Sequence, residues 1–203
     1  MSALEVIKHP LNIAEVVAYG YVGSRLYGLI TDESDTDLAL ITRGKAKSTQ
    51  KVIDDMDYRI YSLDSFAHRL QDTRMSETDL LLSGAMTILD PAYEAYFHAF
   101  RVNSLKYVQQ CEAHISFALR QVTPAVLENH VQYKALKSAV RCAMLEAKMV
   151  AHRDGFNPVF SENEQDTYWE LMKSFTSRIQ NGESAVSLAA GLHGICYKNR
   201  GIR

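Results

Sequence analysis

The spacing of apolar residues changes once along this chain of 203 residues, and this change constrains the fold more than any other feature. Up to about residue 100, short apolar runs alternate with turn residues, as in strands and their connections. Beyond that point, apolar residues recur at helical spacing. The pattern predicts an α+β protein, with a small mixed sheet and flanking helices in residues 1–100 and a helical bundle in residues 101–203.

The first hundred residues contain four expected strands. The first ends at Gly23-Ser24, the second covers residues 37–42, and the third covers residues 56–63, where polar and apolar residues alternate with a period of two. The linker between the second and third strands is short and polar, which favours a hairpin connection. Residues 86–90 are expected to form an edge strand.

Helix signals mark the rest of the chain. Ser62 is expected to cap one helix, Gly84 to stop a second, and Pro91 to open a third. Later helices are expected over residues 92–102, 104–122, 124–153, 165–180 and 184–197. Gly155 follows the longest of these and is expected to end it.

Acidic and basic residues are unevenly distributed along the chain. The formal net charge of −2 excludes a chain that is basic throughout, as a general nucleic-acid coat would be. Residues 32–94 hold 13 acidic side chains against 7 Lys and Arg, whereas residues 101–153 hold 8 Lys and Arg against 3 acidic side chains. This division predicts a site with one part for cations and another for anions.

The sequence carries no signal for a zinc site or for a membrane. The three cysteines lie far apart and match no zinc-ligand spacing. No apolar run approaches the length of a membrane span, and no signal peptide opens the chain. We therefore expect a cytoplasmic protein with no membrane partner, whose state as a monomer or a homodimer stays open.

Two aspartates stand two residues apart at the start of the second expected strand. Asp35 and Asp37 would point to the same face, about 7 Å apart along the strand. Two negative charges about 4 Å apart repel by about 4 kcal/mol at an effective dielectric constant near 20, so such a cluster needs a cation or screening water. Mg²⁺ is typically held by one or two carboxylates together with substrate phosphates. The segment is either a divalent-cation site or a solvated turn that caps local backbone groups.

Asp57 begins the third expected strand and offers a further carboxylate. If this strand pairs beside that of Asp37, three carboxylates suit two divalent ions about 3.5–4 Å apart, which clamp the attacking and leaving oxygens of a phosphoryl displacement. Arg59 lies on the same face and offers an alternative, a structural ion pair with Asp57. Asp54 and Asp55, in the preceding loop, are rivals for the same role.

The Gly-Ser turn before these aspartates suggests a phosphate cradle. Gly23 permits the backbone to approach a ligand closely, and Ser24 offers a hydroxyl and an amide at the start of a short helical turn. Arg25 is placed to touch phosphate or to lie on the surface. A Gly-Ser pair also marks ordinary turns, so its position before the aspartates matters more than its identity.

The order of these features resembles the DNA polymerase β-type nucleotidyltransferase superfamily, whose signature is Gly-Ser, a short spacer and Asp-x-Asp/Glu. Residues 23–40, GSRLYGLITDESDTDLAL, are similar in particular to a predicted nucleotidyltransferase family of bacteria and phages with Gly-Ser-x-x-x-Gly followed by Ser-Asp-x-Asp. Residues 57–66, DYRIYSLDSF, and the Lys- and Arg-bearing segment 133–156 are similar to later parts of that family. The chain departs from the pattern in the short interval before its third carboxylate and in the arginine at position 59.

The resemblance implies a nucleotidyltransferase that moves a nucleoside monophosphate from a nucleoside triphosphate to an acceptor hydroxyl and releases pyrophosphate. It implies that Asp35 and Asp37 hold Mg²⁺ against the triphosphate. Asp57 would bind a second Mg²⁺ ion and help to deprotonate the acceptor. Gly23 and Ser24 would hold the β- and γ-phosphates. Catalysis would then consist mainly of positioning and charge neutralisation.

Four basic residues lie at helical spacing in the second half: Lys134, Lys137, Arg141 and Lys148, separated by three, four and seven positions. These offsets place them along one helix face. One interpretation is a solvated polar face. The other is that Lys137 and Arg141 reach the triphosphate, with the arginine supplying bidentate contacts.

The acceptor is not written in the motif, because one fold serves many substrates. The basic helix face and the basic tail at residues 197–203 slightly favour an RNA 3′ end over a protein hydroxyl or a small molecule. A non-catalytic nucleotide-binding or regulatory protein on the same scaffold is the main alternative. A helical interaction module with an acidic surface loop is the third.

Overall fold

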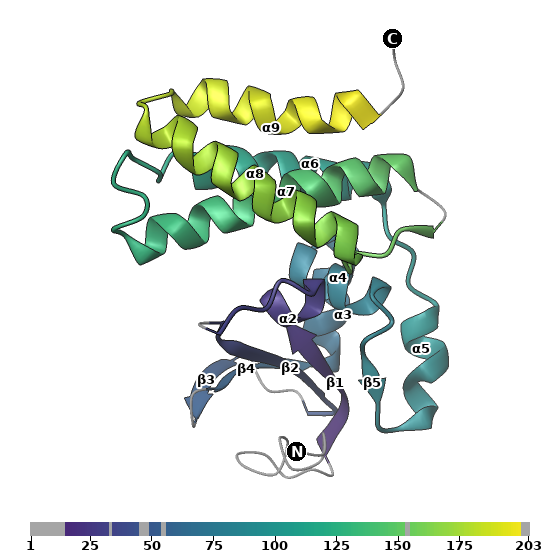
Figure 1. Ribbon diagram of the computed structural model, residues 1–203. Coiled ribbons are helices and arrows are strands. Elements are labelled where there is room, and N and C mark those ends of the chain that lie inside the picture. Colours follow the sequence, from purple (N-terminus) through teal and green to yellow (C-terminus); the bar gives the residue numbers. More distant parts are fainter. Residues whose placement is uncertain (1–14, 33, 45–48, 54–55, 153–154, 200–203) are drawn as a thin grey trace. The chain divides into compact units, whose positions relative to one another are not determined.

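The computed structural model describes residues 15–32, 34–44, 49–53, 56–152 and 155–199. The chain forms two compact units, Met1–Val102 and Asn103–Arg203 (Figure 1). The rival carboxylates Asp54 and Asp55 and the end of the basic tail, residues 200–203, lie outside the described residues.

The first unit is built on a five-stranded mixed sheet with the order β3-β4-β2-β1-β5. Its strands are β1 Val16–Val22, β2 Thr36–Thr42, β3 Thr49–Ile53, β4 Met56–Ser62 and β5 Thr87–Ile88. β2 and β4 are parallel, and the other neighbouring strands are antiparallel. The predicted α+β fold with a small mixed sheet is confirmed, and β5 lies at the sheet edge as expected.

The connection between β2 and β4 differs from the predicted hairpin. Parallel strands cannot be joined by a tight turn, because the chain must return to the starting edge. The returning segment contains β3, which pairs antiparallel with β4 at the edge of the sheet. Most of β3 is exposed, so its residues show no apolar alternation that the sequence pattern could have revealed.

Short helices connect and cover the strands of this unit. They are α2 Ser24–Tyr27, α3 Leu63–Gln71, α4 Met75–Leu82, the 3₁₀ turn η2 Pro91–Tyr93 and α5 Glu94–His98. The Ser65 N–H donates to the hydroxyl of Ser62 over 3.1 Å, which is the predicted N-cap. Gly84 has a φ of +69°, a conformation that suits a residue following α4. The predicted helix over residues 92–102 is shorter than expected.

The two faces of the sheet carry different side chains. Leu38 and Leu40 of β2 belong to a buried apolar cluster with Tyr58 and Ile60 of β4. On the opposite face, a Cβ at Gly20 would lie 2.5 Å from Leu80 Cδ1, so α4 packs directly against β1 there. α3 packs against β4 and β2 (Figure 1). The helices therefore cover one face of the sheet.

The second unit is a bundle of four helices, α6 Ser104–Leu119, α7 His130–Ala151, α8 Glu162–Gln180 and α9 Ala185–Asn199 (Figure 1). α7 packs against each of the other three. It begins at residue 130, later than predicted, because the Gln132 N–H donates to the Asn129 side chain over 3.1 Å. It ends at Ala151, and the Gly155 N–H donates to the carbonyl of His152. None of the helices in the described ranges combines the length and apolarity needed to cross a bilayer.

Candidate functional site

Asp37 and Asp57 lie side by side at one end of the sheet. Each is the second residue of its strand, and the parallel register of β2 and β4 pairs them directly. Neighbouring strands are about 4.8 Å apart, and paired residues project from the same face. Ala39 pairs with Gly20, which faces α4, and Asp37 lies two residues before Ala39 on the same face of β2. Both carboxylates therefore lie on the face that α3 and α4 cover. Strand register therefore holds two negative charges close together.

Gly23 brings the Gly-Ser turn against this pair. Val22 pairs with Asp37, so the turn begins where β1 meets the start of β2. Gly23 has φ +66° and ψ −146°, a region that residues with a side chain rarely occupy. A Cβ at this position would collide with the Asp37 carboxylate and would lie 3.3 Å from its Cγ. The turn and the carboxylate thus form one local structure.

The short helix α2, which follows Gly23, fixes the position of the turn. Tyr27 and Asp79 are buried, and the Tyr27 hydroxyl donates to Asp79 Oδ2 over 2.6 Å, which ties α2 to α4. The Leu29 N–H donates to the carbonyl of Ser24 over 2.9 Å, and Gly28 adopts the left-handed conformation that closes the helix. These contacts fix the backbone that carries Ser24.

Arg25 lies on the same side of the turn as the acidic segment. Its Nε donates to the Thr36 hydroxyl over 3.0 Å, one residue before Asp37. The guanidinium carbon is 5.9 Å from the centroid of the Tyr21 ring. Arg25 is exposed, so its remaining donors can meet an anion at the turn without losing buried contacts.

Asp35 precedes β2 and is exposed. Across the part of the chain that the structure describes, no three His, Cys, Asp or Glu side chains gather into a metal-binding group. The structure therefore brings together Asp37 and Asp57, and it does not gather Asp35 with them into a set of three. Whether the three carboxylates share metal ions stays a prediction.

One carboxylate oxygen of Asp57 accepts a hydrogen bond, and the other accepts none from the described residues. The Gln50 amide donates to Oδ2 from the neighbouring strand β3. Oδ1 is buried and accepts no hydrogen bond from any described residue. A buried acceptor without a partner costs about 1–3 kcal/mol, and more when it is charged. A cation at Oδ1 would remove this cost, so the oxygen donors present suit a divalent ion such as Mg²⁺.

Arg59 forms its ion pair with the neighbouring strand. Its Nη2 lies 3.9 Å from Asp37 Oδ1, and both side chains are partly exposed. The alternative interpretation of the sequence paired this arginine with Asp57 on its own strand. A partly exposed pair at this distance contributes about 0–1 kcal/mol, so Arg59 is not fixed at Asp37.

A cavity of about 290 Å³ lies on the side of β3, and two of its lining residues contact the carboxylates: Gln50 contacts Asp57, and Arg59 contacts Asp37. Its walls come from β3, β4, α3 and α4, and include Gln50, Arg59, Tyr61, Arg69, Ser76 and Glu77. Alternation along β4 places Arg59 and Tyr61 on the face of Asp57, which the sequence reveals. Arg69 and Glu77 meet across the α3–α4 turn, and no local sequence signal indicates that contact.

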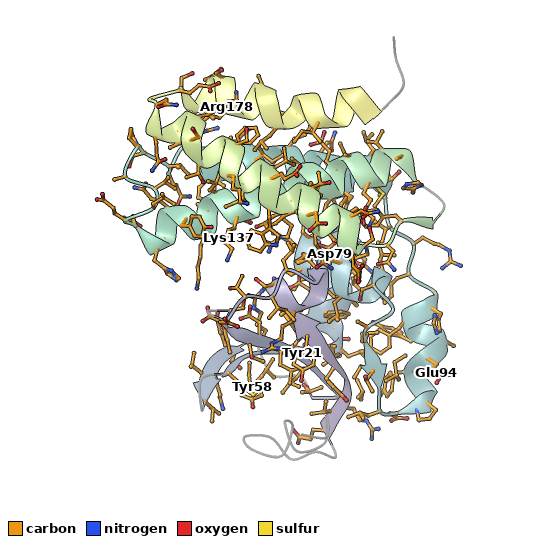
Figure 2. The ribbon with its side chains drawn as sticks, viewed as in Figure 1. Tyr21, Tyr58, Asp79, Glu94, Lys137 and Arg178 are labelled. Carbon is orange, nitrogen blue, oxygen red and sulfur yellow. The ribbon has the colours of Figure 1, made fainter. Side chains whose placement is uncertain are left out.

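The basic residues of α7 have separate surroundings. Lys137 Nζ lies 5.5 Å from the ring centroid of Tyr133 and 5.7 Å from that of Trp169 (Figure 2). Arg141 Nη2 donates to the Ser138 hydroxyl over 3.1 Å. The predicted contacts of Lys137 and Arg141 with a triphosphate are not tested by these neighbours and stay predictions.

Lys148 does not belong to a free cationic face. Its Nζ donates to Glu164 over 2.8 Å and to the carbonyl of Val159 over 2.6 Å. Burial raises the pKa of Glu164, but the hydrogen bonds from Lys148 and Ser161 outweigh it and leave the pKa below its ordinary value. This lysine joins α7 to the start of α8.

Comparison with known proteins adds one distant structural likeness. No protein-family model matches the sequence, and no curated protein matches it. Among solved structures, the chain is similar to a nucleotidyltransferase-like protein from Exiguobacterium sibiricum 255-15, with 11% sequence identity and a TM-score of 0.34. The match covers 97% of this chain and 72% of that chain. A likeness of this extent carries no argument about function, which depends on the residues of the site.

Proposed function

We propose that this protein is a Mg²⁺-dependent nucleotidyltransferase that moves a nucleoside monophosphate from a nucleoside triphosphate to an acceptor hydroxyl. The observation that carries the proposal is the registered pair of Asp37 and Asp57, with the backbone of Gly23 lying against Asp37 in a conformation that favours glycine. Two adjacent carboxylates repel each other and attract a cation, and the glycine lets the backbone of the turn lie directly against Asp37. The protein would act in the cytoplasm.

The carboxylates are assigned to two metal ions. Asp35 and Asp37 would hold one Mg²⁺ ion, and Asp57 would offer its unsatisfied Oδ1 to the second. When bound, the ions neutralise the charge of the triphosphate and of the pyrophosphate that leaves. Asp35 is exposed and two residues from Asp37, so its segment can approach the pair without disturbing buried packing.

The chain itself binds and orients the triphosphate. Gly23 holds the turn directly against Asp37, Ser24 supplies a hydroxyl, and Arg25 supplies a guanidinium for the β- and γ-phosphates. The hydrogen bond from Arg25 to Thr36 is exposed and uncharged at the acceptor, so a phosphate oxygen can replace it with a stronger, charge-assisted bond.

The transfer is a single displacement at the α-phosphorus. The acceptor oxygen forms a bond to phosphorus while the bond to the oxygen that bridges the α- and β-phosphates breaks, and pyrophosphate leaves with that electron pair. Asp57 accepts the proton of the acceptor hydroxyl. Most of the rate enhancement comes from holding the two reactants in line.

The experiment supplies α-labelled nucleoside triphosphates with Mg²⁺ and either total RNA or a cell extract. We expect label to appear in an acceptor product, with pyrophosphate released in equal amount. The double substitution Asp35→Ala/Asp37→Ala should abolish the transfer, whereas the matched change Asp64→Asn on the exposed side of α3 should preserve it. Label moving equally well in the double mutant would refute the proposal.

The ion pair between Arg59 and Asp37 favours a second candidate function. An arginine beside a carboxylate supplies a positive charge that can bind a nucleotide phosphate without a metal ion. A nucleotide-binding or regulatory protein without catalysis needs no more than this. Nucleotide binding without any transfer, whether or not Mg²⁺ is present, would identify this alternative. Binding of neither nucleotide nor metal would favour a helical interaction module.

A further inference from the structure

The cavity beside the carboxylates lies on the opposite side of them from the Gly-Ser turn. In the strand order β3-β4-β2-β1, Gly23 follows β1 and the two aspartates lie on β2 and β4. The cavity lies over β3 and β4, and α3 and α4 form its other walls. From β1 to β3 the sheet extends about 14 Å, three strand spacings. A displacement in line needs its leaving group and its attacking group on opposite sides of the reacting phosphorus.

The lining of this cavity carries an excess of positive charge. Arg59 and Arg69 contribute two guanidinium groups, and Glu77 contributes one carboxylate. The Arg69 side chain is 43% exposed while that of Glu77 is 3% exposed, so the acid is buried behind the arginine. Arg69 therefore presents donors to the cavity that Glu77 does not use.

Arg69 is held in place by a built set of contacts. Its Nη1 donates to Glu77 Oε1 over 3.2 Å, and the Ser76 hydroxyl donates to the other carboxylate oxygen over 3.2 Å. Its guanidinium carbon lies 5.3 Å from the centroid of the Tyr61 ring. Burial, and then the charge of Glu77, raise the pKa of the Tyr61 phenol, which therefore stays protonated.

We propose that this cavity binds a phosphate group of the acceptor through Arg59 and Arg69, and so positions the acceptor hydroxyl near Asp57. The proposal rests on the proposed function of the same site. A guanidinium fork matches two phosphate oxygens, which a point charge cannot do. Gln50 links the two places, because it donates to Asp57 and also lines the cavity.

The loose ion pair of Arg59 couples the acceptor phosphate to the metal site. Arg59 lies 3.9 Å from Asp37 and also lines the cavity. A cation at Asp37 would neutralise the charge that attracts Arg59 and would leave the donors of this arginine available to the phosphate. Phosphate binding in the cavity should therefore strengthen when Mg²⁺ is present.

The volume limits what the cavity can hold. Small-molecule pockets cover about 300–1,000 Å³, so a cavity of about 290 Å³ is at the small end. It suits a phosphate with its sugar. Two sources share this chemistry, the terminal nucleotide of an RNA 3′ end and a small sugar phosphate.

The test measures binding and transfer separately. Ribose 5-phosphate, ribose and a short RNA with a free 3′ hydroxyl are titrated by calorimetry into the whole protein, with and without Mg²⁺. The variant is Arg69→Gln/Glu77→Gln, which removes the arginine without leaving its buried partner charged and unpaired. Arg74→Gln, an exposed arginine after α3, is the matched control.

We expect the double variant to weaken binding of the phosphorylated probe by about 10–100-fold, as loss of one charge-assisted contact does. Arg74→Gln should leave binding within about twofold, and ribose should bind weakly to all three proteins. If the double variant weakens binding of ribose 5-phosphate alone, the acceptor is a small sugar phosphate. If it also weakens binding of the RNA, the acceptor is an RNA 3′ end. Unchanged binding of both probes in the double variant, or equal loss in the control, overturns the proposal.

A kinetic arm separates this proposal from the proposed function. In the double variant the KM for the acceptor should rise at least tenfold while the KM for the nucleoside triphosphate stays within twofold. A wild-type protein that binds ribose 5-phosphate in the cavity but transfers no label contradicts the proposed function alone. A protein that transfers label with equal acceptor KM in both forms contradicts the phosphate site alone.

Discussion

The end of the sheet in the first unit and helix α7 in the second unit both concentrate charge, but they satisfy it differently. At the sheet, register pairs Asp37 with Asp57, and Asp57 Oδ1 is buried without a hydrogen bond from the described residues. On α7, Lys148 is held by a carboxylate at 2.8 Å and by a carbonyl at 2.6 Å. Charge that is already satisfied stabilises the fold, whereas charge that is not satisfied is available to a ligand.

The difference has a physical origin in how the two elements place side chains. Strand register decides which residues of two segments meet, so Asp57 cannot avoid Asp37 once β2 and β4 pair. Helical spacing decides only which face a residue occupies and leaves its partner to the neighbouring helix. Of the four basic residues of α7, Lys148 accordingly finds its partner in Glu164 of α8. We therefore expect the transfer reaction to depend on Asp37 and Asp57 and Lys148 to contribute to the stability of the fold.

The largest expected effect follows from changing Asp37. Asp37→Asn keeps the shape of the side chain and removes the charge that attracts cations, so the rate of label transfer should fall by about 10²–10³-fold. Lys134→Gln, an exposed residue of α7, should leave the rate within about twofold. The measurement is pyrophosphate release at saturating nucleotide. Retention of most of the activity in Asp37→Asn would place the chemistry elsewhere.

The backbone at Gly23 should give the next largest effect. Gly23→Ala combines an unfavourable positive φ with a collision against the Asp37 carboxylate, and should lower the free energy of unfolding by about 2–3 kcal/mol. Gly84→Ala has a similar φ of +69° but an open surrounding, and should cost about 1–2 kcal/mol. Urea denaturation measures both. Equal losses would mean that the turn does not press on the carboxylate.

Much of the sheet of this protein could be predicted from its sequence, since continuous apolar runs mark β1 and β2 and apolar alternation marks β4. Ser62 was identifiable as a helix cap, because its hydroxyl precedes an apolar helical pattern. The strand β3 was not, because an exposed edge strand has no buried face to impose alternation. Without β3, the parallel pairing of β2 and β4 was also hidden, and the linker resembled a hairpin.

The contacts of the candidate site likewise fall into those that the sequence indicates and those that it does not. The contact between Gly23 and Asp37 follows from the order of a strand, a turn and a second strand, which the sequence displays. The hydrogen bond from Gln50 to Asp57 does not, because it depends on β3. The contact between Arg69 and Glu77 depends on how two short helices pack, and this packing has no local signature.

Breaking the ion pair at the end of α7 should have a smaller effect. The pKa of Glu164 is below its ordinary value of 4.5 in the folded protein, so its contribution is present above pH 4.5 and is lost as pH falls through the folded pKa. Glu164→Gln should remove about 0.5–1 kcal/mol of unfolding free energy at pH 7 and less at pH 3. Urea denaturation at both pH values checks this. An effect that grows as the solution becomes acidic would contradict the pairing.

A smaller effect still is expected at His114, which reports the charge of Arg141. Partial burial of the ring, and then the positive charge of Arg141, lower the pKa of His114 below 6.5. Its Nε2 lies 2.8 Å from the Ser138 hydroxyl, which also accepts from Arg141. Arg141→Gln should raise the pKa of His114 towards its ordinary value, and less stability should then be lost on acidification below pH 6.5.

The same imidazole can decide whether Arg141 binds a nucleotide, the prediction that the sequence makes for this residue. An anion on the guanidinium would cancel part of its field, so Mg²⁺ with a nucleoside triphosphate should raise the pKa of His114 in the wild type and not in Arg141→Gln. NMR titration of the ring protons measures the shift, and Asp35→Ala/Asp37→Ala shows whether it requires the sheet end. A rise in the wild type that both variants abolish would support the predicted contact of Arg141 with the nucleotide. If the pKa of His114 does not rise at saturating nucleotide, α7 has a structural role, and the proposed nucleotide site is confined to the carboxylates at the end of the sheet.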